Sequence, residues 1–256
     1  MESVLFLFIL GVAVGTFGTL VGIGGGLILV PFFLLVLHWT PQHTVGTSLA
    51  IVFLNALSGS FAYIKQKKVY YDAAIRFSLA TLPGAFLGSY LAEHFTGYSF
   101  RIAFGAILML IALLIFFRTR QQCDQQQFNK DTFSYNRPLG IMISALVGFL
   151  SSILGIGGGI IHVPAMVYLL SFPTHVATAT SHFVLAISSL VGVISHFLLN
   201  NILLKPALAI GVGAIAGAQL GAHLSLKVKS QLILILLSIA LFALGIRLIL
   251  TAQSGL

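Results

Sequence analysis

The chain has 256 residues, of which 58% are hydrophobic and only 7% are charged, against about 25% charged residues in an ordinary soluble domain. With a mean hydropathy of +1.07, this composition excludes a water-soluble globular protein and predicts an all-α polytopic membrane protein. Thirteen Lys and Arg against five Asp and Glu give a net charge of +8. In such a chain, this excess indicates cytoplasmic loops and not a nucleic-acid partner. The single cysteine, Cys123, excludes a disulfide framework and a multi-thiolate metal site.

The apolar runs follow one another along the chain with polar or Gly/Pro-rich residues between them. The first run begins just after Glu2 with no basic segment before it, so we expect a retained span and not a cleaved signal peptide. The runs are 4–21, 27–37, 44–63, 73–92, 102–117, 139–154, 160–170, 176–199, 206–224 and 232–250. Most are long enough to cross a bilayer core of about 30 Å, but 27–37 and 160–170 are too short. The polar, Gln-rich stretch 118–137 is predicted to be a solvated linker between an N-terminal repeat, 1–117, and a C-terminal repeat, 138–256.

The two halves match each other in sequence at a nearly constant offset of about 133 residues. The matching motifs are Gly22 to Gly26 with Gly155 to Gly159, Val30-Pro31 with Val163-Pro164, Thr47-Ser48 with Thr180-Ser181, and Gly84, Ala85 and Gly88 with Gly217, Ala218 and Gly221. The same mixed motifs in the same order indicate a duplication. Duplicated membrane halves are typical of secondary transporters, whose binding sites lie on interrupted helices at the repeat interface.

The glycine motifs predict a break in each first apolar segment. A continuous helix from Val4 to Leu37 would be about 50 Å long, more than a bilayer requires. The glycines and the following Pro31 or Pro164 therefore predict a break, with a half-helix behind it, and we expect the two breaks to face each other near the repeat interface. Free N–H groups at a helix start, with no Cβ in the way, form an anion site. The candidate substrate-binding glycines are Gly24, Gly25, Gly26, Gly157, Gly158 and Gly159.

The glycines have two alternative interpretations. In the first, the glycines only let neighbouring helices approach closely, as small residues do throughout membrane bundles. A dinucleotide-binding motif is disfavoured, because position 27 is Leu27 and no strand precedes the motif.

Polar side chains within the apolar runs are the other candidates, because burying them in lipid is costly unless they are paired or functional. We expect the hydroxyls that follow the breaks to contact the anion; these are Thr47, Ser48, Thr180 and Ser181. Further candidates for substrate binding are Asn55, His182, His196 and Gln219. Histidine protonation would balance an anion's charge, which leaves proton coupling open. The alternative for these polar residues is an interhelical hydrogen bond, or, for a hydroxyl, a hydrogen bond to the preceding turn of its own helix.

The glycine motif with its following proline in both halves, together with the stretches His43 to Ser48 and His175 to Ser181, resembles the sulfite exporter TauE/SafE family, also called the 4-toluene sulfonate uptake permeases. The resemblance covers nearly the whole chain outside the linker. It implies a carrier of the prokaryotic inner membrane for sulfur-containing anions such as sulfite, sulfonates or sulfoacetate. From the repeated halves we expect a mechanism of alternating access, in which the halves rock against each other. An anion channel, or a transporter for a non-sulfur organic anion, remains the alternative.

An enzyme is not expected. The segment Leu57-Ser58-Gly59 resembles an intramembrane serine protease site only superficially, because Ala56 stands in place of a glycine. No His-Glu-x-x-His metal motif occurs in the sequence, and no cofactor or metal is expected. The expected partners are a small anion and the lipid bilayer, while a homodimer is left open.

The basic residues do not decide between eight membrane spans and ten segments. Both alternatives place the stretch from Lys65 to Arg76 and the linker in the cytoplasm. We favour ten segments with inverted halves, since five segments per repeat turn the second half over. Both termini then face the periplasm.

Overall fold

The structure is a computed structural model that describes residues 4–92, 97–119, 133–228 and 230–253, and these residues form ten α-helices and no strand. The helices in chain order are α1 Val4–Val21, α2 Gly26–Leu35, α3 Pro41–Lys65, α4 Tyr71–Ala92, α5 Gly97–Thr119, α6 Arg137–Leu154, α7 Gly159–Tyr168, α8 Thr174–Leu198, α9 Leu204–Leu224 and α10 Ser230–Gln253. Each predicted apolar run corresponds to one helix. The predicted all-helical architecture is therefore confirmed.

Local sequence signals explain where several helices begin and end. Pro41 starts α3, and the Thr40 side chain accepts a hydrogen bond from the His43 N–H. The Asn136 side chain caps α6 in the same way, accepting from the Leu139 N–H at 3.1 Å. At the other ends, left-handed residues turn the chain out of α2, α3, α7 and α8; these are His38, Lys67, Ser171 and Asn200.

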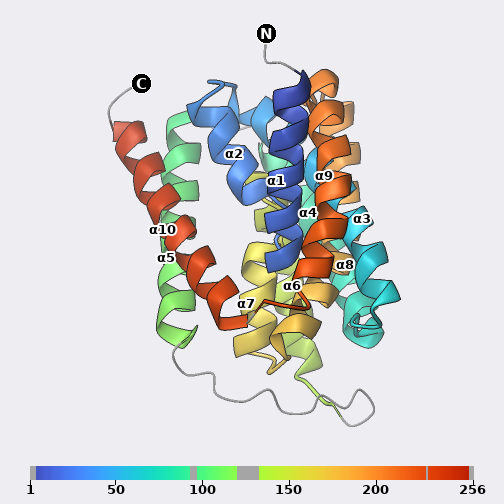
Figure 1. Ribbon diagram of the computed structural model, residues 1–256. Helices are drawn as coiled ribbons and strands as arrows, with labels where there is room; N and C mark the ends of the chain where they lie inside the picture. Colours follow the sequence, from blue (N-terminus) through green and yellow to red (C-terminus); the bar gives the residue numbers. More distant parts are fainter. Residues whose placement is uncertain (1–3, 93–96, 120–132, 229, 254–256) are drawn as a thin grey trace.

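The helices run up and down between two ends of the bundle (Figure 1). The start of α1 and the end of α10 lie at one end, here called the terminus end. The end of α5 and the start of α6 lie at the opposite end, here called the linker end. The short helices α2 and α7 point away from the middle of the bundle, α2 toward the terminus end and α7 toward the linker end.

Packing in the bundle pairs helices that are distant in sequence. Helix α1 packs along α9, α6 packs along α4, and α5 packs along α10 at one side of the bundle. The long helices α3 and α8 contact each other, and they also contact α9 and α4 respectively. Small residues permit the close pairs: a Cβ on Gly217 of α9 would lie 2.3 Å from the Val12 carbonyl oxygen of α1.

The outer surface of the bundle is apolar, as a lipid-facing surface must be. Large hydrophobic side chains such as Leu79, Phe86 and Met142 are more than 60% exposed. Helices α1, α3, α6, α8 and α9 are long and apolar enough to cross a membrane, and shorter apolar helices include α2 and α7. The chain is thus a multi-pass membrane protein.

The linker differs in part from the predicted solvated segment. Residues 120–132, and Cys123 with them, lie outside the described residues. At the near edges, α5 continues to Thr119, and residues 133–136 pack on the bundle. The ring of Phe133 lies 4.7 Å from that of Phe172, and the Tyr70 ring lies 5.8 Å from each of them. Aromatic burial therefore holds the end of the predicted linker against the linker end of the bundle.

Candidate functional site

The breaks between α1 and α2 and between α6 and α7 touch each other through their backbones. A Cβ on Gly26, the first residue of α2, would lie 2.6 Å from the Ile156 carbonyl oxygen. A Cβ on Gly159, the first residue of α7, would lie 2.1 Å from the Gly22 carbonyl oxygen. No side chain fits at these distances, so glycine is required for the two breaks to cross. The expected proximity of the breaks is confirmed.

The other candidate glycines shape the two breaks differently. Gly24 and Gly157 both adopt left-handed backbone angles, with φ of +83° and +73°. Gly25 is also left-handed, whereas Gly158 has an ordinary φ of −64°. A Cβ on Gly25 would approach Val14, and one on Gly158 would approach Val147, both on the preceding helix of the same half. The closest backbone contacts with the opposite break are therefore those of Gly26 and Gly159.

Both breaks present buried backbone N–H groups without a hydrogen-bond partner. Within the described part of the chain, this holds for the N–H groups of Gly25, Gly26 and Leu27 at the first break. At the second break, the N–H groups of the residues from Ile156 to Ile160 likewise have no hydrogen-bond partner. More than about 90% of buried backbone N–H groups in proteins are paired, so a row of orphan donors indicates a place for water or a ligand.

The electrostatics of the crossing also favour an anion. Helices α2 and α7 begin at the crossing and run away from it in opposite directions (Figure 1). Each helix start carries roughly half a positive charge from the aligned peptide dipoles. Two such starts side by side repel each other until a negative charge lies between them.

The serine that follows each break behaves differently in the two halves. The Ser48 hydroxyl on α3 donates a 2.7 Å hydrogen bond to the Gly155 carbonyl, which fixes the second break. Ser181, at the corresponding place on α8, is fully buried and its hydroxyl has no hydrogen-bond partner. Ser181 is therefore the candidate hydroxyl that is free to meet a ligand.

The threonines of the same pairs hold loop ends. The Thr47 hydroxyl accepts a 3.0 Å hydrogen bond from the Leu203 N–H, just before α9. The Thr180 hydroxyl accepts a 3.0 Å bond from the Tyr70 N–H, just before α4. Each threonine thus fixes the start of a helix in the other half, and its part in anion binding stays a prediction.

Asn55 and His182 lie together in a buried polar cluster beside the first break. The Asn55 carbonyl accepts a 2.5 Å hydrogen bond from the Thr19 hydroxyl, and the Asn55 amide reaches the Gly24 carbonyl at 3.5 Å. The His182 Nε2 lies 3.3 Å from the Thr19 hydroxyl, and its Nδ1 is buried without a partner. The Tyr63 hydroxyl donates to the Thr19 carbonyl at 2.7 Å. This cluster connects α1, α3 and α8 one turn before the break.

The hydrogen-bond partners of His196 and Gln219 lie away from the breaks. The His196 ring lies 3.4 Å from the Asn201 amide near the end of α8. The Gln219 amide donates at 2.8 Å to the Ser58 hydroxyl, joining α9 to α3. Gln219 fits the alternative of an interhelical hydrogen bond, whereas His196 contacts the loop that follows its own helix.

Sequence reasoning missed three residues at the crossing. Thr19 carries the polar cluster, but a lone threonine in an apolar run gives little signal. Val52 of α3 and Leu185 of α8 touch both breaks, yet apolar residues in an apolar span carry no signal. Val52 and Leu185 are, however, equivalent positions of the two halves, 133 residues apart.

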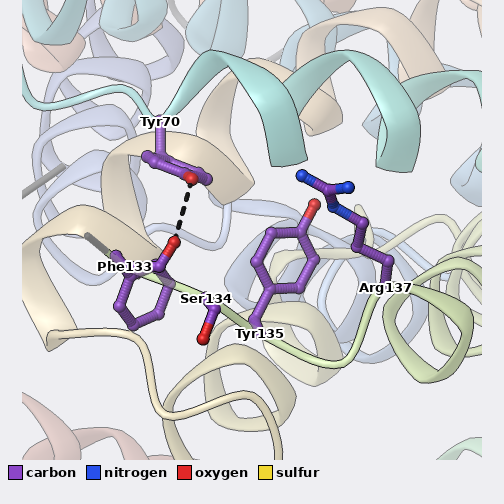
Figure 2. Close-up of a pocket in the computed structure, with 5 residues that line it drawn as sticks. All are labelled: Tyr70, Phe133, Ser134, Tyr135 and Arg137. Carbon is purple, nitrogen blue, oxygen red and sulfur yellow. Dashed lines mark hydrogen bonds between the residues drawn. The ribbon is translucent and has the colours of Figure 1, made fainter. Parts of the chain in front are cut away.

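A groove of about 310 Å³ lies at the linker end, lined by Tyr70, Phe133, Ser134, Tyr135 and Arg137 (Figure 2). Its floor is tied to α4 through Asp72, which accepts a 2.9 Å bond from the Tyr135 hydroxyl and forms a 3.0 Å ion pair with Arg76. Burial and this bond raise the pKa of the Tyr135 hydroxyl above its ordinary value, which strengthens its hold on the proton that it donates to Asp72. The groove adjoins the Tyr70–Thr180 contact.

No cluster of three or more His, Cys, Asp or Glu residues that could bind a metal occurs in the described ranges. The fold and the crossing glycine breaks define a polytopic helical membrane protein with interrupted helices, the architecture of membrane transporters.

Residues 7–248 match the sulfite exporter TauE/SafE family, and the chain belongs to this family. It is 36% identical to the probable membrane transporter protein YunE of Bacillus subtilis, over 96% of this chain and 97% of that protein. A probable membrane transporter protein of Methanocaldococcus jannaschii is 28% identical, over 94% of this chain and 93% of that protein. No solved structure matches the chain. The protein is accordingly a membrane transporter and not an enzyme.

Proposed function

We propose that the protein is a secondary transporter that carries a small sulfur-containing anion, of the sulfite, sulfonate or sulfoacetate type, across the cytoplasmic membrane by alternating access. The observation that carries this proposal is the crossing of the two breaks, where the orphan N–H groups of Gly25 to Leu27 and Ile156 to Ile160 gather at two helix starts. The family name supports the sulfur oxyanion as substrate class.

Neutral donors suit a site that must release its ligand. A fixed Lys or Arg at mid-membrane would bind an anion strongly and be costly when the site is empty. The described basic residues lie instead near helix ends and in loops, or, for Arg247, on an exposed position of α10. Backbone N–H groups and the Ser181 hydroxyl provide attraction without a net charge.

We propose that the two halves are inverted repeats and that their relative motion moves the substrate. Helix α1 packs on α9 as α6 packs on α4, and Thr47 contacts Leu203 as Thr180 contacts Tyr70. These contacts exchange when 133 is added to or subtracted from the residue numbers. Ten membrane segments in two inverted halves would rock about the crossing and expose it to either side in turn.

Ligand-induced thermal stabilisation of the purified protein tests the substrate class. Sulfite, thiosulfate, sulfonates, sulfoacetate and carboxylates would be compared at equal concentration. A ligand at a hundred times its dissociation constant adds about 2.7 kcal/mol of stability, a readily measured rise in Tm. A Ser181→Ala variant should show a smaller rise. Stabilisation by carboxylates alone would exclude the sulfur-anion class.

Counterflow in proteoliposomes then separates a carrier from a channel. External labelled anion should accumulate transiently in vesicles preloaded with unlabelled anion, because a carrier exchanges them through one site. Flux without counterflow or saturation would contradict alternating access and favour the channel.

A further inference from the structure

We propose that Val52 and Leu185 form an apolar plug that fills the anion's place between the two breaks and sets the largest anion that the protein carries. This inference rests on the proposed function and concerns the same site.

The plug touches both breaks at once. A Cβ on Gly24 would lie 2.5 Å from Leu185 Cδ2 and 3.0 Å from Val52 Cγ1. A Cβ on Gly157 would lie 2.9 Å from Leu185 Cδ1 and 2.9 Å from Val52 Cγ1. The leucine therefore places one methyl group against each break, and the valine lies against both.

The plug is a small apolar cluster of its own. Val52 and Leu185 are at most 1% exposed, and the buried cluster that contains them has only Ala56 and Ala186 as further members. The larger apolar cores of the bundle are formed by other residues. Removing the plug would thus open space at the crossing without removing one of these larger cores.

Polar residues flank the plug on both helices. On α3, Ser48 lies one turn before Val52, and Asn55 lies one turn after it. On α8, Ser181 lies one turn before Leu185, with its hydroxyl unpartnered. An apolar pair between polar turns, beside orphan N–H groups, is where a bound anion would lie once the two side chains rotate aside.

Size selectivity follows from the geometry. The body of an anion held by the N–H groups would meet the side chains of Val52 and Leu185. A change of one methylene in such a contact alters discrimination by roughly 10- to 200-fold. The plug therefore admits small anions and rejects bulky ones.

The test compares uptake of sulfite, methanesulfonate, ethanesulfonate and benzenesulfonate into proteoliposomes. Leu185→Ala and Val52→Ala should each raise the ratio of benzenesulfonate to sulfite uptake by about tenfold or more. Leu185→Phe should lower uptake of every anion. The matched control is Leu170→Ala, which removes the same volume from the buried cluster around Phe77 and Phe172.

A second measurement does not depend on truncating the plug. In a Cys123→Ser background, Leu185→Cys should react with a charged methanethiosulfonate reagent added from either side, and sulfite should slow the reaction. Leu170→Cys should stay unreactive under the same conditions.

The outcomes separate the two proposals. If the parental protein takes up none of these anions, the proposed function is wrong. Two results would overturn the plug alone. One is parental uptake of sulfite with unchanged size ratios in both alanine variants. The other is a Leu185→Cys variant that transports sulfite while its introduced thiol stays unreactive.

Discussion

Ser48 and Ser181 occupy equivalent places in the two halves, yet only the Ser48 hydroxyl has a hydrogen-bond partner. Ser48 fixes the Gly155 carbonyl, whereas the Ser181 hydroxyl is buried without a partner. Ser48→Ala should lower the free energy of unfolding by about 1–3 kcal/mol, because a buried carbonyl loses its donor. Ser181→Ala should leave stability unchanged or raise it, and should weaken sulfite binding.

Thermal unfolding of the two serine variants, with and without sulfite, measures both effects. Equal loss of Tm in the two variants would contradict the assigned roles. So would a Ser181→Ala variant whose stabilisation by sulfite matched that of the parental protein.

Gly159 allows the two breaks to approach each other closely. Its added Cβ would overlap the Gly22 carbonyl, a backbone atom that cannot move aside, so Gly159→Ala should separate the breaks. We expect little monodisperse protein on size-exclusion chromatography, or folded protein without uptake. The control is Gly192→Ala on α8, where the nearest atom is the flexible Leu49 Cδ1 at 3.1 Å. Parental uptake by a well-folded Gly159→Ala variant would show that the close crossing is dispensable.

The sequence allowed the residues of the breaks to be predicted, but not the direction of each hydroxyl. The glycine and proline pattern has a direct backbone consequence, so Gly22 to Gly26 could be identified without a structure. Whether Thr47 faces the break or the Leu203 N–H depends on helix rotation and on a loop 156 residues away. No local pattern contains that information.

At the scale of the elements, the Thr180–Tyr70 contact connects α8 to the start of α4. Thr180→Val removes the acceptor of the Tyr70 N–H and should cost about 1 kcal/mol. Hydrogen exchange at the Tyr70 amide should quicken in this variant. Thr180→Ser keeps the acceptor and should exchange at the parental rate, whereas unchanged exchange in Thr180→Val would contradict the contact.

Helix positions could be predicted from apolar runs because a membrane span must be continuously apolar and of nearly fixed length. Helix partners could not. Helices α1 and α9 pair through small residues such as Gly11 and Gly213, but similar glycines occur on α4 and α6. Only the three-dimensional arrangement decides which small-residue faces meet.

At the scale of the whole molecule, the two ends differ in charge. Among the described basic residues, the positions at or near the linker end are Lys65, Lys67, Lys68, Arg76, Arg118, Arg137 and Lys227, whereas those toward the terminus end are Arg101, Lys205 and Arg247. This asymmetry predicts that the linker end is cytoplasmic and that both termini face the opposite side. A C-terminal alkaline phosphatase fusion should be active and a fluorescent-protein fusion dark. The reverse pair of results would contradict ten segments.

The pairing of α1 with α9 also bears on how the protein is made. During synthesis at about 5–20 residues per second, the last residue of α1, Val21, is complete roughly 10–40 s before the first residue of α9, Leu204, exists. Throughout that interval the glycine-bearing face of α1 has no permanent neighbour. The amino-terminal half by itself therefore leaves this face of α1 without its helix partner, and a ribosome that stalls after α5 leaves an incomplete bundle.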